Sequence, residues 1–255
     1  MDFSLLIPIF LGLLAGGLIN YLADVLPHTL RLSTTNGFAR PLCLNPDCKA
    51  AFRWTDTLLL RRCPKCGRGR SLRTYATLVL AEALSLFIWF SPPHTLGYAL
   101  GLVVLTYLLL VTVIDLEHRL ILRPLSLAGL ILAALAGIYV RGWQSTLIGG
   151  AAGFAIMFLF YLFGLLFTRW RARRLGKADS EEALGSGDVT LGTILGLLLG
   201  WPGICLGLLL GILVGGAGSL VVILWMLARR NYQAFTAIPY APFLILSAVF
   251  LLFCP

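Results

Sequence analysis

The sequence predicts an all-α polytopic membrane protein with about eight transmembrane helices and a small cytoplasmic domain after the first helix. Hydrophobic residues make up 59% of the 255 residues and charged residues only 12%, whereas soluble domains carry about 25% charged residues. The apolar runs are continuous, and most are long enough to cross a hydrocarbon core of about 30 Å as helices. They do not alternate apolar with polar residues as barrel strands would.

The connections between the apolar stretches alternate between a basic side and a side with almost no charge. Four connections on one side hold 19 of the 20 Lys and Arg, so the positive-inside rule makes that side cytoplasmic. The division is a first helix (1–22), a cytoplasmic loop domain (23–74) and a membrane domain (75–255). The predicted spans are residues 4–22, 75–91, 96–114, 125–140, 145–167, 189–201, 203–227 and 239–253, of which 189–201 is the shortest and richest in glycine.

The longest hydrophilic loop contains two closely spaced cysteine pairs, Cys43 with Cys48 and Cys63 with Cys66. Four thiolates held in two turns suit tetrahedral Zn²⁺, and four protein ligands leave no open catalytic position. A cytoplasmic location keeps thiols reduced, which argues against disulfides. We therefore expect a structural zinc site in a zinc-binding-like domain. A redox pair or plain buried thiols remain the alternatives.

Two polar residues fall within the first two predicted spans. Asn20 lies near the end of the first span, where a polar side chain close to the headgroups needs no special role. Glu82 lies inside the second span and could pair with a neighbouring helix, orient a ligand or relay protons. A structural hydrogen bond is the interpretation we favour for Glu82.

Two aspartates stand at the ends of apolar spans. Asp115 follows the span 96–114, and Asp188 opens the span 189–201 after Gly185-Ser186-Gly187. A carboxylate near hydrocarbon costs several kcal/mol and is usually functional. A helix-end charge and a helix-capping acid are the structural alternatives. Because both residues fall at cytoplasmic ends, we expect a dyad that shares one proton and activates water.

Small residues recur in the last predicted spans at intervals of about four, a spacing that lets helix backbones approach closely. We expect these glycines to pack helices and not to bind ligands: Gly192, Gly196, Gly200, Gly207, Gly211 and Gly215.

Five regions along nearly the whole chain resemble the bacterial type IV prepilin peptidases, intramembrane aspartic proteases of the Gly-x-Gly-Asp class (peptidase A24). Their order and spacing are more specific than any single motif. Thr190 stands where the family commonly has Lys, and Gly17 stands where its opening motif has Ser. The regions are Gly16–Asn20 with Leu26-Pro27, the four cysteines, Ile114–Glu117, Gly185–Leu191 and Ile238–Phe243.

The resemblance implies that Asp115 and Asp188 are the catalytic pair of an aspartic endopeptidase. Its substrate would be a prepilin or pseudopilin precursor with a basic leader, cut after Gly at the start of the apolar helix. Many family members also methylate the new N-terminus with S-adenosylmethionine. The resemblance further implies a multi-pass protein of the bacterial inner membrane. Residues of the matching motifs are expected to support the site: Gly185, Gly187, Glu82, Glu117, Asn20, Pro239 and Pro242.

Contacts to the substrate leader are harder to predict, because a basic loop repels a basic leader. Glu117 is a candidate partner for the leader, together with Glu181 and Glu182. A nucleic-acid partner is not expected, because the loop domain has few aromatic residues and is tethered to a membrane.

Two other functions remain as alternatives to a peptidase. A proton- or cation-coupled transporter would use acids inside its spans, but such a protein needs polar residues along a path through the bilayer, and few occur here. A non-enzymatic scaffold for pilus or secretion assembly would depend on the cysteine loop and not on the aspartates.

Overall fold

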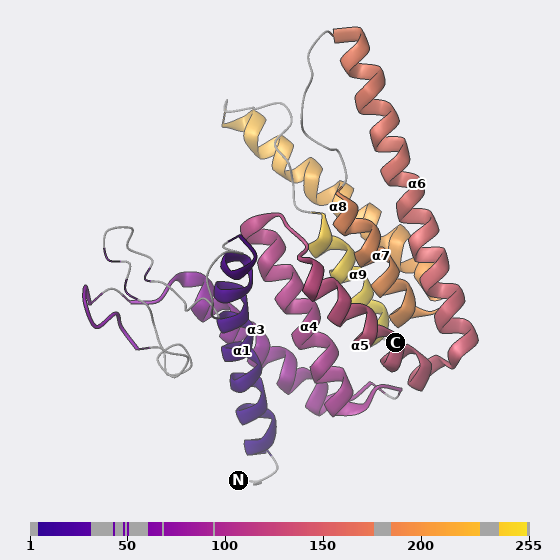
Figure 1. Cartoon of the computed structure of the whole chain (residues 1–255). Coiled ribbons are helices and arrows are strands. Elements are labelled where there is room, and N and C mark those ends of the chain that lie inside the picture. Colours follow the sequence, from indigo (N-terminus) through magenta and orange to yellow (C-terminus); the bar gives the residue numbers. More distant parts are fainter. Residues whose placement is uncertain are drawn as a thin grey trace. The chain divides into compact units, whose positions relative to one another are not determined.

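The computed structural model describes residues 5–31, 43, 48, 50, 61–67, 69–93, 95–175, 185–229 and 240–253. Within these ranges the regular structure is entirely helical, with no strand, which confirms the predicted fold class (Figure 1). The helices are α1 (Leu6–Arg31), α3 (Leu72–Phe90), α4 (Gly97–His118), α5 (Arg123–Arg141), α6 (Trp143–Leu175), α7 (Ser186–Leu199), α8 (Gly203–Ala228) and α9 (Ala241–Phe253).

Six of these helices, namely α1, α3, α4, α5, α6 and α8, are long and apolar enough to cross a membrane. The other two are apolar but shorter, with 14 residues in α7 and 13 in α9. At 1.5 Å per residue, 14 residues extend about 21 Å, less than a hydrocarbon core of about 30 Å. The eight predicted helices are therefore present, and two of them are too short for a full straight crossing.

The chain packs as two units, residues 1–118 and residues 119–255. In the first unit α1, α3 and α4 all pack on one another. The α1–α3 contact is close because α1 carries glycine where the helices meet. A Cβ on Gly16 would stand 2.9 Å from a side-chain atom of Leu78 and 3.1 Å from its Cα, so any larger residue would force α1 and α3 apart.

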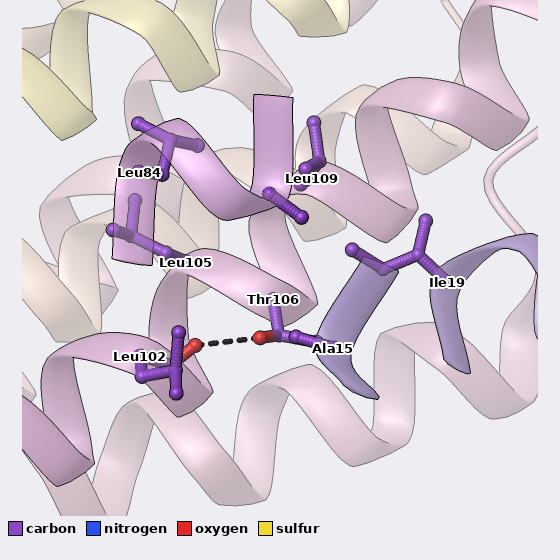
Figure 2. Close-up of a pocket in the computed structure, with 8 residues that line it drawn as sticks. Ala15, Ile19, Leu84, Leu102, Leu105, Thr106 and Leu109 are labelled. Atoms are coloured by element: carbon purple, nitrogen blue, oxygen red, sulfur yellow. Dashed lines mark hydrogen bonds between the residues drawn. The ribbon is translucent and has the colours of Figure 1, made fainter. Parts of the chain in front are cut away.

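Figure 2 shows a small hollow between the three helices of the first unit. Seven of its eight lining residues are apolar, and the hydroxyl of Thr106 donates to the carbonyl of Leu102 on its own helix at 2.7 Å. The hollow therefore presents no polar group for a ligand. Its lining residues are Ala15, Ile19, Ala81, Leu84, Leu102, Leu105, Thr106 and Leu109.

In the second unit α7 is the central helix and packs against α5, α6, α8 and α9. Its contact with α6 is closest where Gly153 faces Gly192: a Cβ on Gly153 would stand 2.3 Å from the carbonyl oxygen of Gly192. The predicted packing role of the glycines is confirmed, because a Cβ on any of the six would stand 2.3–2.8 Å from an atom of a neighbouring residue.

Contacts in the second unit also agree with the predicted alternation of the connections. At one end, the Nε–H of Arg141 donates to the carbonyl of Leu198 at 3.2 Å, and the hydroxyl of Ser145 donates to the carbonyl of Trp201 at 3.0 Å. These groups close the carboxyl-terminal end of α7. The amino-terminal end of α7, which carries Asp188, lies at the opposite end of the unit.

Candidate active site and metal centre

Asp115 lies in the last turn of α4, in the first unit. The residue is buried, with a relative exposure of 6%, and α4 ends three residues later at His118. Most of the residues that precede it along α4 are buried apolar ones, among them Val113 and Ile114. The carboxylate is thus carried to the end of an apolar helix, as the sequence predicts, and its backbone is fixed by helical hydrogen bonds.

Asp188 is the third residue of α7, in the second unit, and it is half-buried. Its Oδ2 accepts a hydrogen bond from the backbone N–H of Gly185 at 3.2 Å, while its own N–H donates to the carbonyl of Gly185 at 3.1 Å. Since glycine has no side-chain oxygen, only this half of a capping box is possible. The N-cap residue is therefore Gly185, and Asp188 acts as the N3 residue, where the contact occupies one carboxylate oxygen. The pairing of Asp188 with Asp115 stays a prediction.

The two glycines before Asp188 differ in what surrounds them. A Cβ on Gly187 would stand 2.8 Å from the Cβ of Ile121, which belongs to the segment between α4 and α5. A Cβ on Gly185 would meet no atom closer than 3.8 Å, and its φ of −81° is ordinary. Gly187 is therefore required by a packing contact that the sequence did not indicate.

Tyr240 is a neighbour of Asp188 that the sequence reasoning did not single out. Its ring packs against α8, where a Cβ on Gly215 would stand 2.8 Å from the ring. Burial raises the pKa of Tyr240, and its phenol lies near enough to Asp188 for the charge of that carboxylate to raise this pKa further. Pro242 follows as the second residue of α9, where a missing N–H breaks no helical hydrogen bond. Pro239 lies outside the described residues.

Asn20 is buried at 2% exposure in a polar network between α1 and α3. Its side-chain amide donates to the carbonyls of Gly16 at 3.0 Å and Thr74 at 3.2 Å, and its oxygen accepts from the hydroxyl of Thr77 at 2.8 Å. Asn20 therefore joins α1 to α3 through its side chain, a role that the sequence did not indicate.

Glu117 forms an ion pair with Arg73 of α3, and Arg73 also pairs with Asp24 of α1. One guanidinium thus faces two carboxylates, and the three residues together carry one net negative charge. Glu117 as a partner for the leader stays a prediction. The other two candidates, Glu181 and Glu182, lie outside the described residues.

Glu82 makes no hydrogen bond within the described part of the chain, contrary to the structural bond that we favoured. Both of its carboxylate oxygens are buried. The reason is its neighbour on α1. A Cβ on Gly12 would stand 2.4 Å from Oε2, so the carboxyl group faces a glycine, which has no side-chain hydrogen-bond donor.

The four cysteines converge, as the sequence predicts, although most of the loop between them lies outside the described residues. Their sulfur atoms all lie within 4.8 Å of one another, with 3.5 Å between Cys43 and Cys66 and 3.6 Å between Cys48 and Cys63. Disulfide sulfurs are about 2.05 Å apart, so these pairs are not disulfides. A tetrahedral ion with Zn–S bonds of about 2.3 Å has sulfurs about 3.8 Å apart. The cluster can therefore hold one metal ion.

The second cysteine pair has the local backbone of a metal-binding turn. Gly67, with a φ of +68°, follows Cys66 and donates its N–H to the carbonyl of Cys63 at 2.9 Å. The backbone N–H of Cys66 lowers the pKa of the Cys63 thiol to about 6, against the opposing effect of burial, and that of Lys65 adds to the lowering. A stabilised thiolate is the form that binds a metal.

Comparison of the chain with known proteins identifies relatives. A family model described as the type IV leader peptidase family (Peptidase A24) matches residues 102–220. This segment contains both Asp115 and Asp188, whereas the four cysteines precede it. No solved structure matches the chain.

Three curated relatives carry the name prepilin leader peptidase/N-methyltransferase. The protein from Klebsiella pneumoniae is 30% identical over 205 residues, which cover 74% of this chain and 82% of that protein. The Pectobacterium carotovorum protein is 30% identical over 59% of this chain, which spans about half (49%) of it. The Myxococcus xanthus protein is 29% identical over 86% of this chain and 62% of its own length. The chain therefore belongs to the type IV leader peptidase family.

Proposed function

We propose that this protein is a membrane-embedded aspartic endopeptidase that removes the basic leader from type IV prepilin or pseudopilin precursors. Membership of the type IV leader peptidase family carries this proposal, because the matched segment contains both aspartates. Six apolar helices of membrane-crossing length support a membrane location. The family resemblance makes the bacterial inner membrane the proposed one. The comparisons do not favour the transporter or the scaffold.

One contact in the second unit bears on how Asp188 is presented, because the segment between α4 and α5 packs against the start of α7. Asp115 lies in the last turn of α4, and Ile121, which packs on Gly187 beside Asp188, follows it six positions later in the sequence. We propose that the carboxylates of Asp115 and Asp188 share one water molecule.

In the proposed mechanism one carboxyl group is ionised and the other is protonated, because two adjacent like charges cannot both persist. The ionised aspartate takes a proton from water as the oxygen attacks the scissile carbonyl, and the protonated partner donates to the carbonyl oxygen. Collapse of the tetrahedral intermediate breaks the C–N bond, and a proton passes to the leaving amine. The products are a carboxylate on the leader and a free amino terminus on the pilin.

Co-expression with a candidate prepilin tests this function, with leader removal read by mass spectrometry. Asp115→Asn and Asp188→Asn are expected to abolish cleavage while the protein still inserts and melts as the wild type does. Asp179→Asn, which changes an acid of the predicted loop 168–188, is the control and is expected to cleave normally. Cleavage near the wild-type rate in either dyad variant would falsify the mechanism.

For the cysteine cluster we propose a structural zinc ion, held by Cys43, Cys48, Cys63 and Cys66. The sulfur separations support a site for a soft, tetrahedral metal. Purified protein is expected to contain about one zinc per chain by elemental analysis, and Cys63→Ser is expected to lower this content. Cys205→Ser, which changes a cysteine of α8 instead, should leave it unchanged. A zinc-free wild-type protein would rule the site out.

N-methylation of the new amino terminus is a second proposed activity, which rests on the names of the three relatives. The methyl group would pass from the sulfonium of S-adenosylmethionine to the amine, with release of a proton. Incubation of cleaved pilin with labelled methyl donor tests it. Transfer of label to the pilin would support the methyltransferase activity. If cleavage is normal but no label is transferred, the protein acts as a peptidase without methyltransferase activity.

A further inference from the structure

A single arginine joins three helices of the first unit. The guanidinium of Arg73, near the start of α3, forms ion pairs with Asp24 at the carboxyl-terminal part of α1 and with Glu117 in the last turn of α4. The side chain of Arg73 is 21% exposed, and those of its partners are 25% and 35% exposed. We call these three residues the Arg73 clamp.

The position of Arg73 in its helix shows that the clamp is specified by tertiary contacts. The N-cap of α3 is Ser71, whose hydroxyl accepts from the N–H of Thr74 at 3.4 Å, so Arg73 is the second residue of the helix. Cations are unfavourable at this end of the helix dipole. Two carboxylates from other helices offset that effect. The backbone is held as well, because the hydroxyl of Thr77 donates to the carbonyl of Arg73 at 3.0 Å.

The clamp acts on the turn of α4 that carries Asp115. Asp115 and Glu117 both belong to the last turn, which ends at His118, and Arg119 then leaves the helix with a φ of +51°. The last carbonyls of a helix have no partner within it, so a side-chain contact with another helix adds to the helical hydrogen bonds that order this turn. The ion pair between Glu117 and Arg73 is such a contact.

We propose that Arg73 is a positioning residue for Asp115: it fixes the last turn of α4 by holding Glu117 and Asp24 at once. The inference rests on the proposed peptidase function and adds a residue that the dyad mechanism does not name. Only the planar guanidinium presents donors on separate nitrogens to two carboxylates, so lysine is expected to replace it incompletely.

The test separates a positioning role from a merely structural one. Partly exposed ion pairs add little to folding stability, so Arg73→Gln is expected to melt close to the wild type. A displacement of about 1 Å can cost about 10²-fold in rate, and a smaller shift of Asp115 is expected to lower kcat about ten-fold. KM is expected to stay within about two-fold, because no substrate contact is removed. The kcat of Arg73→Lys is expected to lie between that of the wild type and that of Arg73→Gln.

Three further variants complete the experiment, which uses purified full-length protein and a prepilin substrate. Glu117→Ala releases α4 but keeps the pair of Arg73 with Asp24, so it tests the clamp even where Arg73→Gln folds poorly. The double variant Arg73→Gln with Glu117→Ala should be no slower than Arg73→Gln, because Arg73→Gln already removes the ion pair that Glu117→Ala breaks. The matched control is Arg123→Gln, an exposed arginine at the start of α5 that forms no ion pair within the described residues; its kcat should be unchanged.

A normal kcat in both Arg73→Gln and Glu117→Ala would overturn the inference, and so would a loss confined to KM or a double variant whose loss is the product of the single losses. Asp115→Asn in the same assay tells this failure from a failure of the proposed function. If Asp115→Asn is inactive and the clamp variants are normal, only the positioning role is lost. If Asp115→Asn is active, the dyad itself is wrong.

Discussion

Replacement of Gly187 by alanine gives a sharp test of how α7 presents Asp188. The new Cβ would stand 2.8 Å from the Cβ of Ile121 and 3.3 Å from both Cγ1 and Cδ1. Carbon atoms in contact normally lie about 3.5–4.0 Å apart, so the two segments must separate by about 1 Å. The Cβ of Ile121 is fixed to its backbone, and rotation of the side chain therefore cannot relieve the clash.

The expected magnitude follows from that displacement. Overpacking by one carbon costs about 1–3 kcal/mol, and in a chain of this size each kcal/mol lowers the melting temperature by about 2–4 °C. Gly187→Ala should therefore melt about 2–12 °C below the wild type in detergent. Because Asp188 is the next residue, a shift of about 1 Å is also expected to reduce leader cleavage by about 10²-fold.

Gly185→Ala is the matched control for stability, since its Cβ would meet no atom closer than 3.8 Å. It should melt with the wild type, whereas Gly187→Ala should not. Thermal melting and mass-spectrometric cleavage assays on the same preparations give both readouts. Equal melting temperatures for the two alanine variants, or wild-type cleavage by Gly187→Ala, would refute this reasoning.

The remaining predictions concern helix packing in each unit. Gly153→Ala on α6 should melt several degrees below the wild type, because its Cβ would stand 2.3 Å from a backbone oxygen of α7, whereas Gly216→Ala on α8 meets no atom within 4 Å and should not. Asn20→Leu should cost about 1–3 kcal/mol, because Thr74 and Thr77 lose a buried hydrogen-bond partner. Thr106→Val is its control, since that hydroxyl bonds only within its own helix. Melting in detergent checks both pairs, and equal values within a pair would contradict the packing argument.

Features set by local chemistry could be predicted from the sequence. Continuous apolar runs predicted the helices, and glycines at intervals of about four predicted close helix contacts, as Gly192 and Gly196 make with α6. Cysteine spacing predicted a cluster able to hold a metal ion. Helix ends were less accurate: the predicted first span ends at residue 22, whereas α1 continues to Arg31. Hydrophobicity marks where a helix leaves the bilayer and not where its hydrogen bonds end.

Features that depend on a partner distant in the chain could not be predicted. Glu117 pairs with Arg73, 44 residues away, a contact that no sequence pattern indicated. Glu82 was expected to make a structural hydrogen bond and instead faces Gly12. In both cases the residue type was informative, but its partner was decided by how α3 packs against α1 and α4.

By itself, the sequence determined that this is a helical membrane protein of the type IV leader peptidase family, with an aspartate at the end of each of two apolar helices and a cluster of four cysteines. Only the tertiary structure decided which residues lie around them: Ile121 packs against Gly187, next to Asp188, and Arg73 pairs with Glu117, in the same helical turn as Asp115. The physical reason is that helix formation and span length follow from neighbouring residues. The support of a catalytic side chain follows instead from contacts between helices, which no local pattern encodes.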